Sequence, residues 1–390
     1  MSWEFFLVTL ITIGVAFGGL MGTIAYLILV ERRLAAFIQD RYGPNRVGWA
    51  GLLQPIADGA KFLLKEDVIP GYVNKTLYIL GPSIAVFTAM AGFAIVPFGP
   101  VDQAPSWMRF VIAPDVNIGM IYIFCVGSLG VYGVILGGWA SNNKYSSLGS
   151  MRASAQVVSY EIPLGMSIIG VVLMTSSLSL NDILMHQANQ GVLGWNVWTQ
   201  PLALLIFFVS ALAETNRLPF DLSECEQELV GGFHTEYSSM KFALYFLGEY
   251  AHIITVCFLT AILFFGGWQF PLIAEADSAY LGATLVKVVV LLTKVLMIIL
   301  LIMFIRWTIP RFRFDQLMNL AWLGLIPMAA MNILVVMTAK QFDWPIWTLP
   351  LGSLAIFVAA GLIGTSGKFV VSDQTVDFSE SPEGYVHVHS

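Results

Sequence analysis

Hydrophobic residues fall into nine long runs along the chain, and short polar segments separate them. A helix needs about 20 apolar residues to cross a bilayer, and each run is of that order. The runs cover residues 5–30, 77–98, 118–140, 154–176, 200–216, 242–267, 285–308, 319–338 and 344–364. Because open strands would leave backbone groups unpaired in lipid, we predict an all-α integral membrane protein with a bundle of about nine transmembrane helices.

Composition supports the same class. The chain is 57% hydrophobic and only 11% charged, and its mean hydropathy is +0.77. A soluble domain is normally about 25% charged, so this chain lacks the polar surface that a soluble fold needs. The first run has no basic residue before it and no small-residue cleavage site, so we expect it to be a retained helix. The three cysteines are far apart, which predicts no bound metal and no iron–sulfur cluster in this chain.

The basic residues set the predicted orientation. Most of the 19 lysines and arginines lie on one side if the N-terminus is outside the cell, and only Arg109 and Lys340 clearly lie in outer loops. Cytoplasmic loops normally carry the excess of Lys and Arg. We therefore predict an outer N-terminus and a cytoplasmic C-terminus.

The first inner loop contains an amphipathic segment near 52–66. Its apolar residues share one side, whereas Gln54, Asp58, Lys61 and Lys65 share the other. The segment is too short to span a bilayer, so we predict an interfacial helix. Two roles remain open for it: a membrane-surface anchor, or one wall of an opening for a lipid-soluble substrate.

The third inner loop is unusually acidic. The stretch AETNRLPFDLSECEQELV, residues 213–230, contains five acids in a chain that has 25 in total. Pro219 prevents one continuous helix, so we predict a helix end, a turn at Leu218–Pro219 and then a short helix in which Glu224 and Glu228 face together. Carboxylates that repel one another in a partly dry cavity have raised pKa values and can exchange protons near neutral pH. The alternative is a solvated acidic loop that contacts a basic partner.

Ionisable residues also occur inside the hydrophobic runs, where they are costly and usually functional. Glu161 and Glu249 are the predicted proton carriers, and Glu236 extends this acidic set toward the inner surface. His252 and Lys294 lie in the same kind of run. His252 is either a proton carrier or a residue that packs against a neighbour, and we expect the packing role. The fourth inner loop is basic, with Arg306, Arg311 and Arg313. These arginines either pair with the acidic loop or simply follow the charge rule for cytoplasmic loops.

Four long motifs resemble one known family. The motifs are ERRLAAFIQDRYGPNRVGWAGLLQPIADGAKFLLKED, NNKYSSLGSMRASAQVVSYEIP, AETNRLPFDLSECEQELVGGFHTEYSSMKFALYFLGEY and RWTIPRFRFDQLM. They are similar to stretches of the H-type subunits of proton-pumping NADH:quinone oxidoreductase, respiratory complex I. The resemblance covers about residues 4–338.

This resemblance implies a fold and a function. It implies a membrane subunit of a translocase that forms the quinone access path and part of the quinone-reduction chamber, and that couples quinone reduction to proton translocation. The chain would bind no cofactor itself: quinone is the substrate, and FMN and iron–sulfur clusters belong to partner subunits. The implied partners are membrane subunits of the A, J and K types, peripheral subunits of the B, D and I types, and the lipid of a bacterial inner membrane, with no nucleic acid.

The resemblance also implies roles for individual residues. Those implied for the quinone path are Glu31, Arg32, Arg41, Asp58 and Glu66. Those implied for the acidic loop at the chamber are Glu214, Arg217, Asp221, Glu224, Glu226 and Glu228. Glu161 and Glu249 match positions on the proton route, and Arg306 and Arg311 match the basic loop that faces it.

Two features lie outside the family pattern. The family core has eight helices, so we predict a core over 1–338, an extra C-terminal transmembrane helix within 339–371 and an acidic flexible tail over 372–390. Two other functions remain open: a homologous membrane anchor of a hydrogenase-type or ferredoxin-linked complex, and a free-standing proton-coupled transporter. The motifs fit ubiquinone and menaquinone equally well.

Overall fold

Helices account for almost all of the regular structure. The computed structural model describes residues 3–101, 110–113, 116–223, 226–271, 273–274 and 281–366. Its α-helices, in chain order, are α1 Trp3–Ile38, α2 Gln54–Leu64, α3 Lys75–Ala91, α4 Gly119–Ala140, α5 Lys144–Thr175, α6 Leu180–Gln190, α7 Asn196–Thr199, α8 Pro201–Glu214, α9 Glu226–Leu229, α10 Ser239–Phe264, α11 Leu281–Thr308, α12 Phe314–Asn319, α13 Ile326–Gln341 and α14 Thr348–Ser366. The predicted all-α class is confirmed.

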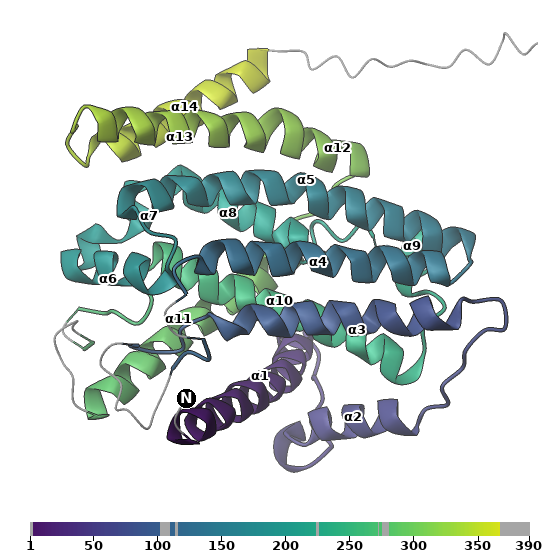
Figure 1. Cartoon of the computed structure of the whole chain (residues 1–390). Helices are drawn as coiled ribbons and strands as arrows, with labels where there is room; N and C mark the ends of the chain where they lie inside the picture. The colour runs from purple at the N-terminus through teal and green to yellow at the C-terminus, as the bar shows by residue number, and fades with distance from the viewer. Residues whose placement is uncertain are drawn as a thin grey trace, which may run out of the picture.

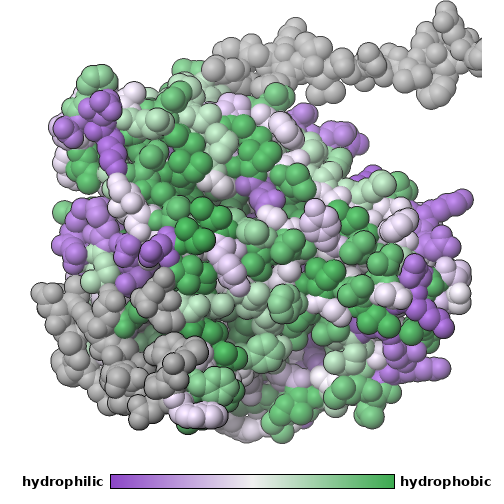
Figure 2. Space-filling model, viewed as in Figure 1, coloured by the Kyte–Doolittle hydropathy of each residue, from purple (hydrophilic) through white to green (hydrophobic). Residues whose placement is uncertain are grey.

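Each of the nine predicted runs coincides with a helix. Within the described residues, seven helices are long and apolar enough to cross a membrane, and α8 and α14 are shorter apolar helices. Hydrophilic residues gather at the two ends of the helices, and hydrophobic residues cover the band between them (Figure 2). This banding fits a multi-pass membrane protein, because lipid replaces water around the middle of the bundle. The exact number of crossings and the orientation stay predictions.

The helices pack in a layered bundle. α4 lies between α3 and α5, and α13 and α14 lie beyond α5 (Figure 1). α10 packs against α3 and α11, and its segment Ile253–Phe264 is completely buried. α1 and α2 stand at the opposite edge from α13 and α14 (Figure 1), and α1 contacts the middle of α10 through Glu31 and Tyr250.

The length of α1 explains where its last turns lie. At 1.5 Å per residue its 36 residues extend about 54 Å. The hydrocarbon core of a bilayer is only about 30 Å thick. Glu31 and Arg32, near the end of α1, can therefore lie at the polar side of the membrane while the first turns cross the lipid.

Glycines allow α3 and α4 to approach closely. A Cβ on Gly133 would lie 2.8 Å from the carbonyl oxygen of Gly81 and 2.9 Å from the amide nitrogen of Ala85. Both of these neighbours are backbone atoms that cannot rotate away. Close approach through small residues is the usual way in which membrane helices pack tightly.

We expect Gly133→Ala to destabilise the bundle by about 1–3 kcal/mol, because α3 and α4 must move apart to admit the methyl group. Thermal unfolding in detergent measures this loss. Gly165→Ala is the matched control, since a Cβ at Gly165 meets nothing within 4 Å. Equal melting temperatures for the two variants would contradict the predicted close packing.

Candidate functional site

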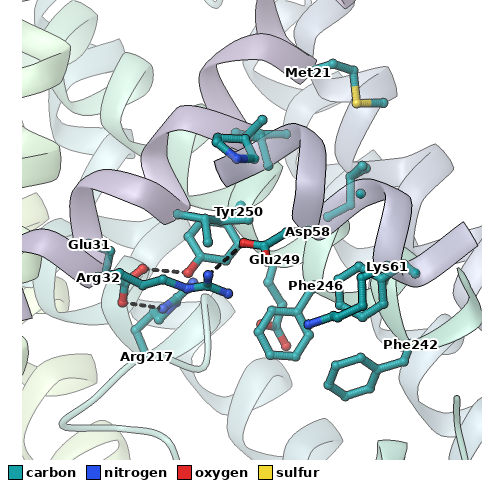
Figure 3. A pocket seen from close by; sticks show the side chains of 18 of the residues that line it. Met21, Glu31, Arg32, Asp58, Lys61, Arg217, Phe242, Phe246, Glu249 and Tyr250 are labelled. Carbon is teal, nitrogen blue, oxygen red and sulfur yellow. Dashed lines mark hydrogen bonds and ion pairs between the residues drawn. The ribbon is translucent and has the colours of Figure 1, made fainter. Parts of the chain in front are cut away.

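A large cavity lies where α1, α2 and α10 meet. Its volume is about 750 Å³, and the segment after α8 and the last turn of α11 complete its wall. Most of the lining is apolar and aromatic, including Ile24, Ile28, Phe62, Phe242 and Phe246. Charged side chains converge at one end of this cavity, as Figure 3 shows for Glu31, Arg32, Asp58 and Arg217. The space therefore suits a ligand with a long apolar part and a polar end.

The polar end is organised around the carboxylate of Glu31, which is only 8% exposed. Arg217 donates from Nη1 to Glu31 Oε1 over 3.0 Å, and Arg306 donates to the same oxygen. The hydroxyl of Tyr250 donates to Glu31 Oε2 over 2.5 Å, and the Arg217 guanidinium lies 4.2 Å from the centre of the Tyr250 ring (Figure 3). A buried carboxylate is stable only when it is paired and hydrogen-bonded in this way.

A second ion pair attaches α2 to α1. Arg32 Nη1 lies 2.6 Å from Asp58 Oδ2, and Gln54 donates to the other oxygen of Asp58 over 3.1 Å. At the end of α2, the Ser239 hydroxyl lies within 2.9 Å of the Phe62 carbonyl and 3.0 Å of the Lys65 carbonyl. No residue of α2 is buried, so these polar contacts hold the helix in place as a wall of the cavity.

A smaller cavity of about 100 Å³ is lined by two partly buried acids, Glu214 and Glu249. Glu214 Oε1 lies 3.2 Å from His252 Nε2, which lines the same space. Glu161, which is not part of this lining, accepts a hydrogen bond from Ser128. Asn216 and Glu249 line both the small cavity and the large one, so the two cavities border each other.

The acidic and basic loops contact each other. Arg311 Nη2 lies 3.4 Å from Asp221 Oδ2, the Phe312 amide donates to the Pro219 carbonyl over 3.3 Å, and the rings of Phe220 and Phe312 stack. Arg152 of α5 lies 2.6 Å from Glu228. These contacts favour the interpretation in which the basic loop pairs with the acidic loop. They disfavour the alternative in which its arginines only follow the charge rule for cytoplasmic loops.

The predicted turn lies at Leu218–Pro219, which is a cis peptide, and the short helix after it is α9. Glu224 lies outside the described residues, and the side chain of Glu226 is not described, so the facing of Glu224 and Glu228 stays a prediction.

Arg313 precedes α12, where its backbone amide donates to Gln316 over 3.2 Å. The Arg313 backbone therefore takes part in the hydrogen bonding that caps the first turn of α12.

Glu236 belongs to a separate network at the end of α3. It accepts hydrogen bonds from Asn143 over 2.6 Å and from Tyr72 over 3.0 Å, and the latter bond raises the pKa of the Tyr72 phenol. Burial raises the pKa of the neighbouring Tyr237 to about 12, so its neutral hydroxyl donates to the Tyr78 carbonyl over 3.0 Å. Glu236 lines neither cavity, so its role in a proton route stays a prediction without geometric support.

Two residues assigned to the quinone path also lie outside the cavity lining. Arg41 donates to Gln39 over 2.7 Å, and Glu66 is exposed at the end of α2. Conversely, sequence reasoning missed Tyr250 and Asn216, which contribute to the cavities. Tyr250 follows the predicted acid Glu249 directly, but only the geometry shows that its hydroxyl reaches α1. His252, which we expected to pack against a neighbour, lies beside Glu214 and pairs with its carboxylate.

Within the described part of the chain, no group of three His, Cys, Asp or Glu side chains could hold a metal ion. The fold and the site together define a class: an all-helical membrane protein with an apolar cavity that borders a partly buried cluster of ionisable residues. The chain belongs to the NADH dehydrogenase family, whose model matches residues 11–337.

Relatives in this family are similar over most of their length, and all three described here are H-type subunits of NADH-quinone oxidoreductase. One from Cytophaga hutchinsonii is 48% identical over 80% of this chain and 90% of its own. The one from Flavobacterium johnsoniae is 48% identical over 83% of this chain and 93% of its own. The one from Leptospira biflexa is 45% identical over 88% of this chain and 96% of its own. The resemblance drawn from the four motifs is confirmed.

We expect Glu31→Gln to destabilise the subunit by about 3 kcal/mol, because two guanidiniums then lose the carboxylate that balances their charge. Tyr250→Phe removes one hydrogen bond from the same carboxylate and should cost about 1 kcal/mol. Thermal unfolding in detergent ranks the two variants. A smaller loss for Glu31→Gln than for Tyr250→Phe would show that the ion cluster is not the main support of this site.

Proposed function

We propose that this chain is a membrane subunit of an NADH:quinone oxidoreductase that forms the quinone access path and part of the quinone-reduction chamber. The observation that carries the proposal is the shared wall of two cavities, an apolar one of quinone size and a small one lined by partly buried acids. The names of the relatives supply the enzyme and its substrate class, and all three relatives are bacterial. A bacterial plasma membrane is the proposed location.

The large cavity has the chemistry that a quinone requires. The isoprenoid tail is apolar and suits the aliphatic and aromatic walls that α1, α2 and α10 supply. The quinone ring carries two carbonyl oxygens, which suit donors such as the guanidiniums at the polar end. The interfacial position predicted for α2 places the opening at the height where a lipid-soluble molecule leaves the bilayer.

Coupling follows from the position of the acids. Reduction of a quinone to a quinol consumes two electrons and two protons, and the electrons come from FMN and iron–sulfur clusters that we assign to partner subunits. We propose that loss of protons from the chamber changes the charge felt by Glu249, which borders both cavities. Glu249 then exchanges a proton with the Glu214–His252 pair and with Glu161, which begins the proton route across the membrane arm.

The loop contacts suggest how the partners attach. Peripheral subunits of the B, D and I types would cover the inner end of the cavity, where the acidic and basic loops meet. Membrane subunits of the A, J and K types would continue the acidic route. This assembly would supply the electron input that the chain's own described residues do not provide.

Narrowing the cavity tests the access path. Ala25→Trp places an indole on the lining of the large cavity, and we expect it to raise the KM for a long-tailed quinone about tenfold in the intact complex. Tyr26→Trp is the matched control, because Tyr26 is 48% exposed on α1 and does not line the cavity. NADH oxidation by a water-soluble acceptor reports the peripheral arm alone and should not change. An unaltered quinone KM in Ala25→Trp would contradict the path.

Removing the loop acids tests the coupling. The triple change Glu224→Gln, Glu226→Gln and Glu228→Gln should lower proton translocation per quinone reduced, because the loop then loses its exchangeable protons. Proton uptake and NADH oxidation are measured together in liposomes that contain the whole complex. Intact quinone reduction with intact pumping would refute a role of this loop in coupling.

A further inference from the structure

A fully buried glutamine on α5 contacts the segment between α8 and α9 at three points. Gln156 is 0% exposed and lines neither the large nor the small cavity. Its side-chain nitrogen lies 2.8 Å from the Ala213 carbonyl oxygen, 2.8 Å from the Phe220 carbonyl oxygen and 3.2 Å from Asn216 Oδ1. One amide therefore contacts both ends of the segment 213–220, the first part of the acidic loop.

The backbone of this segment leaves the helix in a sharp turn. Ala213 lies in the last turn of α8, where carbonyl groups lack donors from their own helix. Asn216 has a φ of +49°, a left-handed conformation that few residues other than glycine adopt. The Phe220 amide then donates to the Arg217 carbonyl over 2.8 Å. Gln156 thus satisfies one backbone carbonyl before this turn and one after it.

The partners of Gln156 require a hydrogen-bond donor at this position. The two backbone carbonyl oxygens can only accept, so the NH₂ group of Gln156, with its two protons, must face them. A carboxylate of the same length would place oxygen against oxygen in a buried site. Asn216 Oδ1 also faces this NH₂ group. The NH₂ group of Asn216 is then the part of its side chain that can donate elsewhere.

α5 contacts the same segment at a second point. One turn after Gln156, the ring of Tyr160 lies 5.9 Å from the ring of Phe220, and its hydroxyl donates to the Leu317 carbonyl over 2.8 Å. Gln156 and Tyr160 are both fully buried, and close-packed interiors leave such side chains little room to move. The segment is therefore fixed against α5 by one polar and one aromatic contact.

The segment that Gln156 holds carries residues of both cavities. Arg217 lines the large cavity and pairs with Glu31, Glu214 lines the small cavity, and Asn216 lines both. The positions of these three side chains therefore depend on a residue that a ligand in either cavity does not touch.

We propose that Gln156 is a positioning residue for quinone binding. It holds the segment 213–220 so that the Asn216 amide and the Arg217 guanidinium keep their donors at the large cavity, where the carbonyl oxygens of a quinone ring accept them. A shift of about 1 Å in a positioning group can cost about a hundredfold in rate. This inference rests on the proposed function, because it requires that a quinone occupies the large cavity.

Quinone kinetics in the intact complex test the proposal. Gln156→Met keeps the size of the side chain and removes both donors. We expect it to raise the KM for a long-tailed quinone about tenfold, which corresponds to the loss of about one well-placed hydrogen bond. The kcat should change less than about twofold, because the groups that deliver electrons belong to partner subunits in the proposed function. NADH oxidation by a water-soluble acceptor should not change.

A second buried glutamine separates positioning from a loss of stability alone. Gln187 is equally buried, donates to the Ile262 carbonyl over 2.9 Å and accepts from the Gly266 amide over 3.2 Å, but it lines neither cavity. Gln187→Met should lower the melting temperature, as Gln156→Met does, and leave the quinone KM unchanged. An equal rise in KM in both variants, or an unaltered KM in Gln156→Met, would overturn the proposal.

Gln156→Asn covers the case in which the methionine variant fails to assemble. Its amide is one carbon shorter and cannot reach both carbonyls, so a raised KM is again expected, and an unaltered KM would overturn the proposal. Ala25→Trp reports on the access path separately. A raised KM in Ala25→Trp together with an unaltered KM in the Gln156 variants would refute the positioning role and leave the proposed function standing.

Discussion

The hydrogen-bonded, ion-paired carboxylate of the buried Glu31 is the interaction on which the large cavity depends. It belongs to α1, whereas its partners Arg217, Tyr250 and Arg306 come from the segment after α8, from α10 and from α11. One charge thus joins four elements that are far apart in sequence. These elements form much of the wall of the large cavity, so the same ion cluster holds the cavity open and gives it a polar end.

The two halves of α10 differ in chemistry. Its first half carries Glu249, Tyr250 and His252, which line the two cavities. Its second half, from Ile253 to Phe264, is buried throughout and contains no Asp, Glu, Lys, Arg or His. The charged side chains of this helix are therefore confined to the half that borders the cavities, where polar neighbours can compensate them.

Much of the fold could be predicted from the sequence. Lipid requires long apolar runs and internally paired backbones, and these two constraints placed all nine runs on observed helices. Spacing and Pro219 also predicted the helix end, the turn and the short α9. Boundaries shifted where polar residues extend a helix beyond its apolar run, as at the start of α5, where the Asn143 side chain accepts a hydrogen bond from the Tyr145 amide and caps the first turn.

The site could be predicted only in part. Charges inside apolar runs are conspicuous, so Glu161 and Glu249 were found in this way, whereas Glu31 and the path role of Asp58 came from the family resemblance. The ion pairs depend on how distant segments pack against one another. The sequence does not show that Glu31 pairs with Arg217 and Arg306, or that His252 pairs with Glu214. Exposed acids such as Glu66 look the same as lining acids in a sequence, because burial alone distinguishes them.

The central claim is that a quinone occupies the cavity between α1, α2 and α10. Photo-crosslinking with a quinone that carries a photoreactive group on its tail tests it most directly in the intact complex. Mapping of the labelled peptides should place the label on residues 21–35 of α1, 55–63 of α2 or 240–250 of α10, and excess natural quinone should abolish it. Labelling confined to α13 and α14, at the opposite edge of the bundle, would contradict the account.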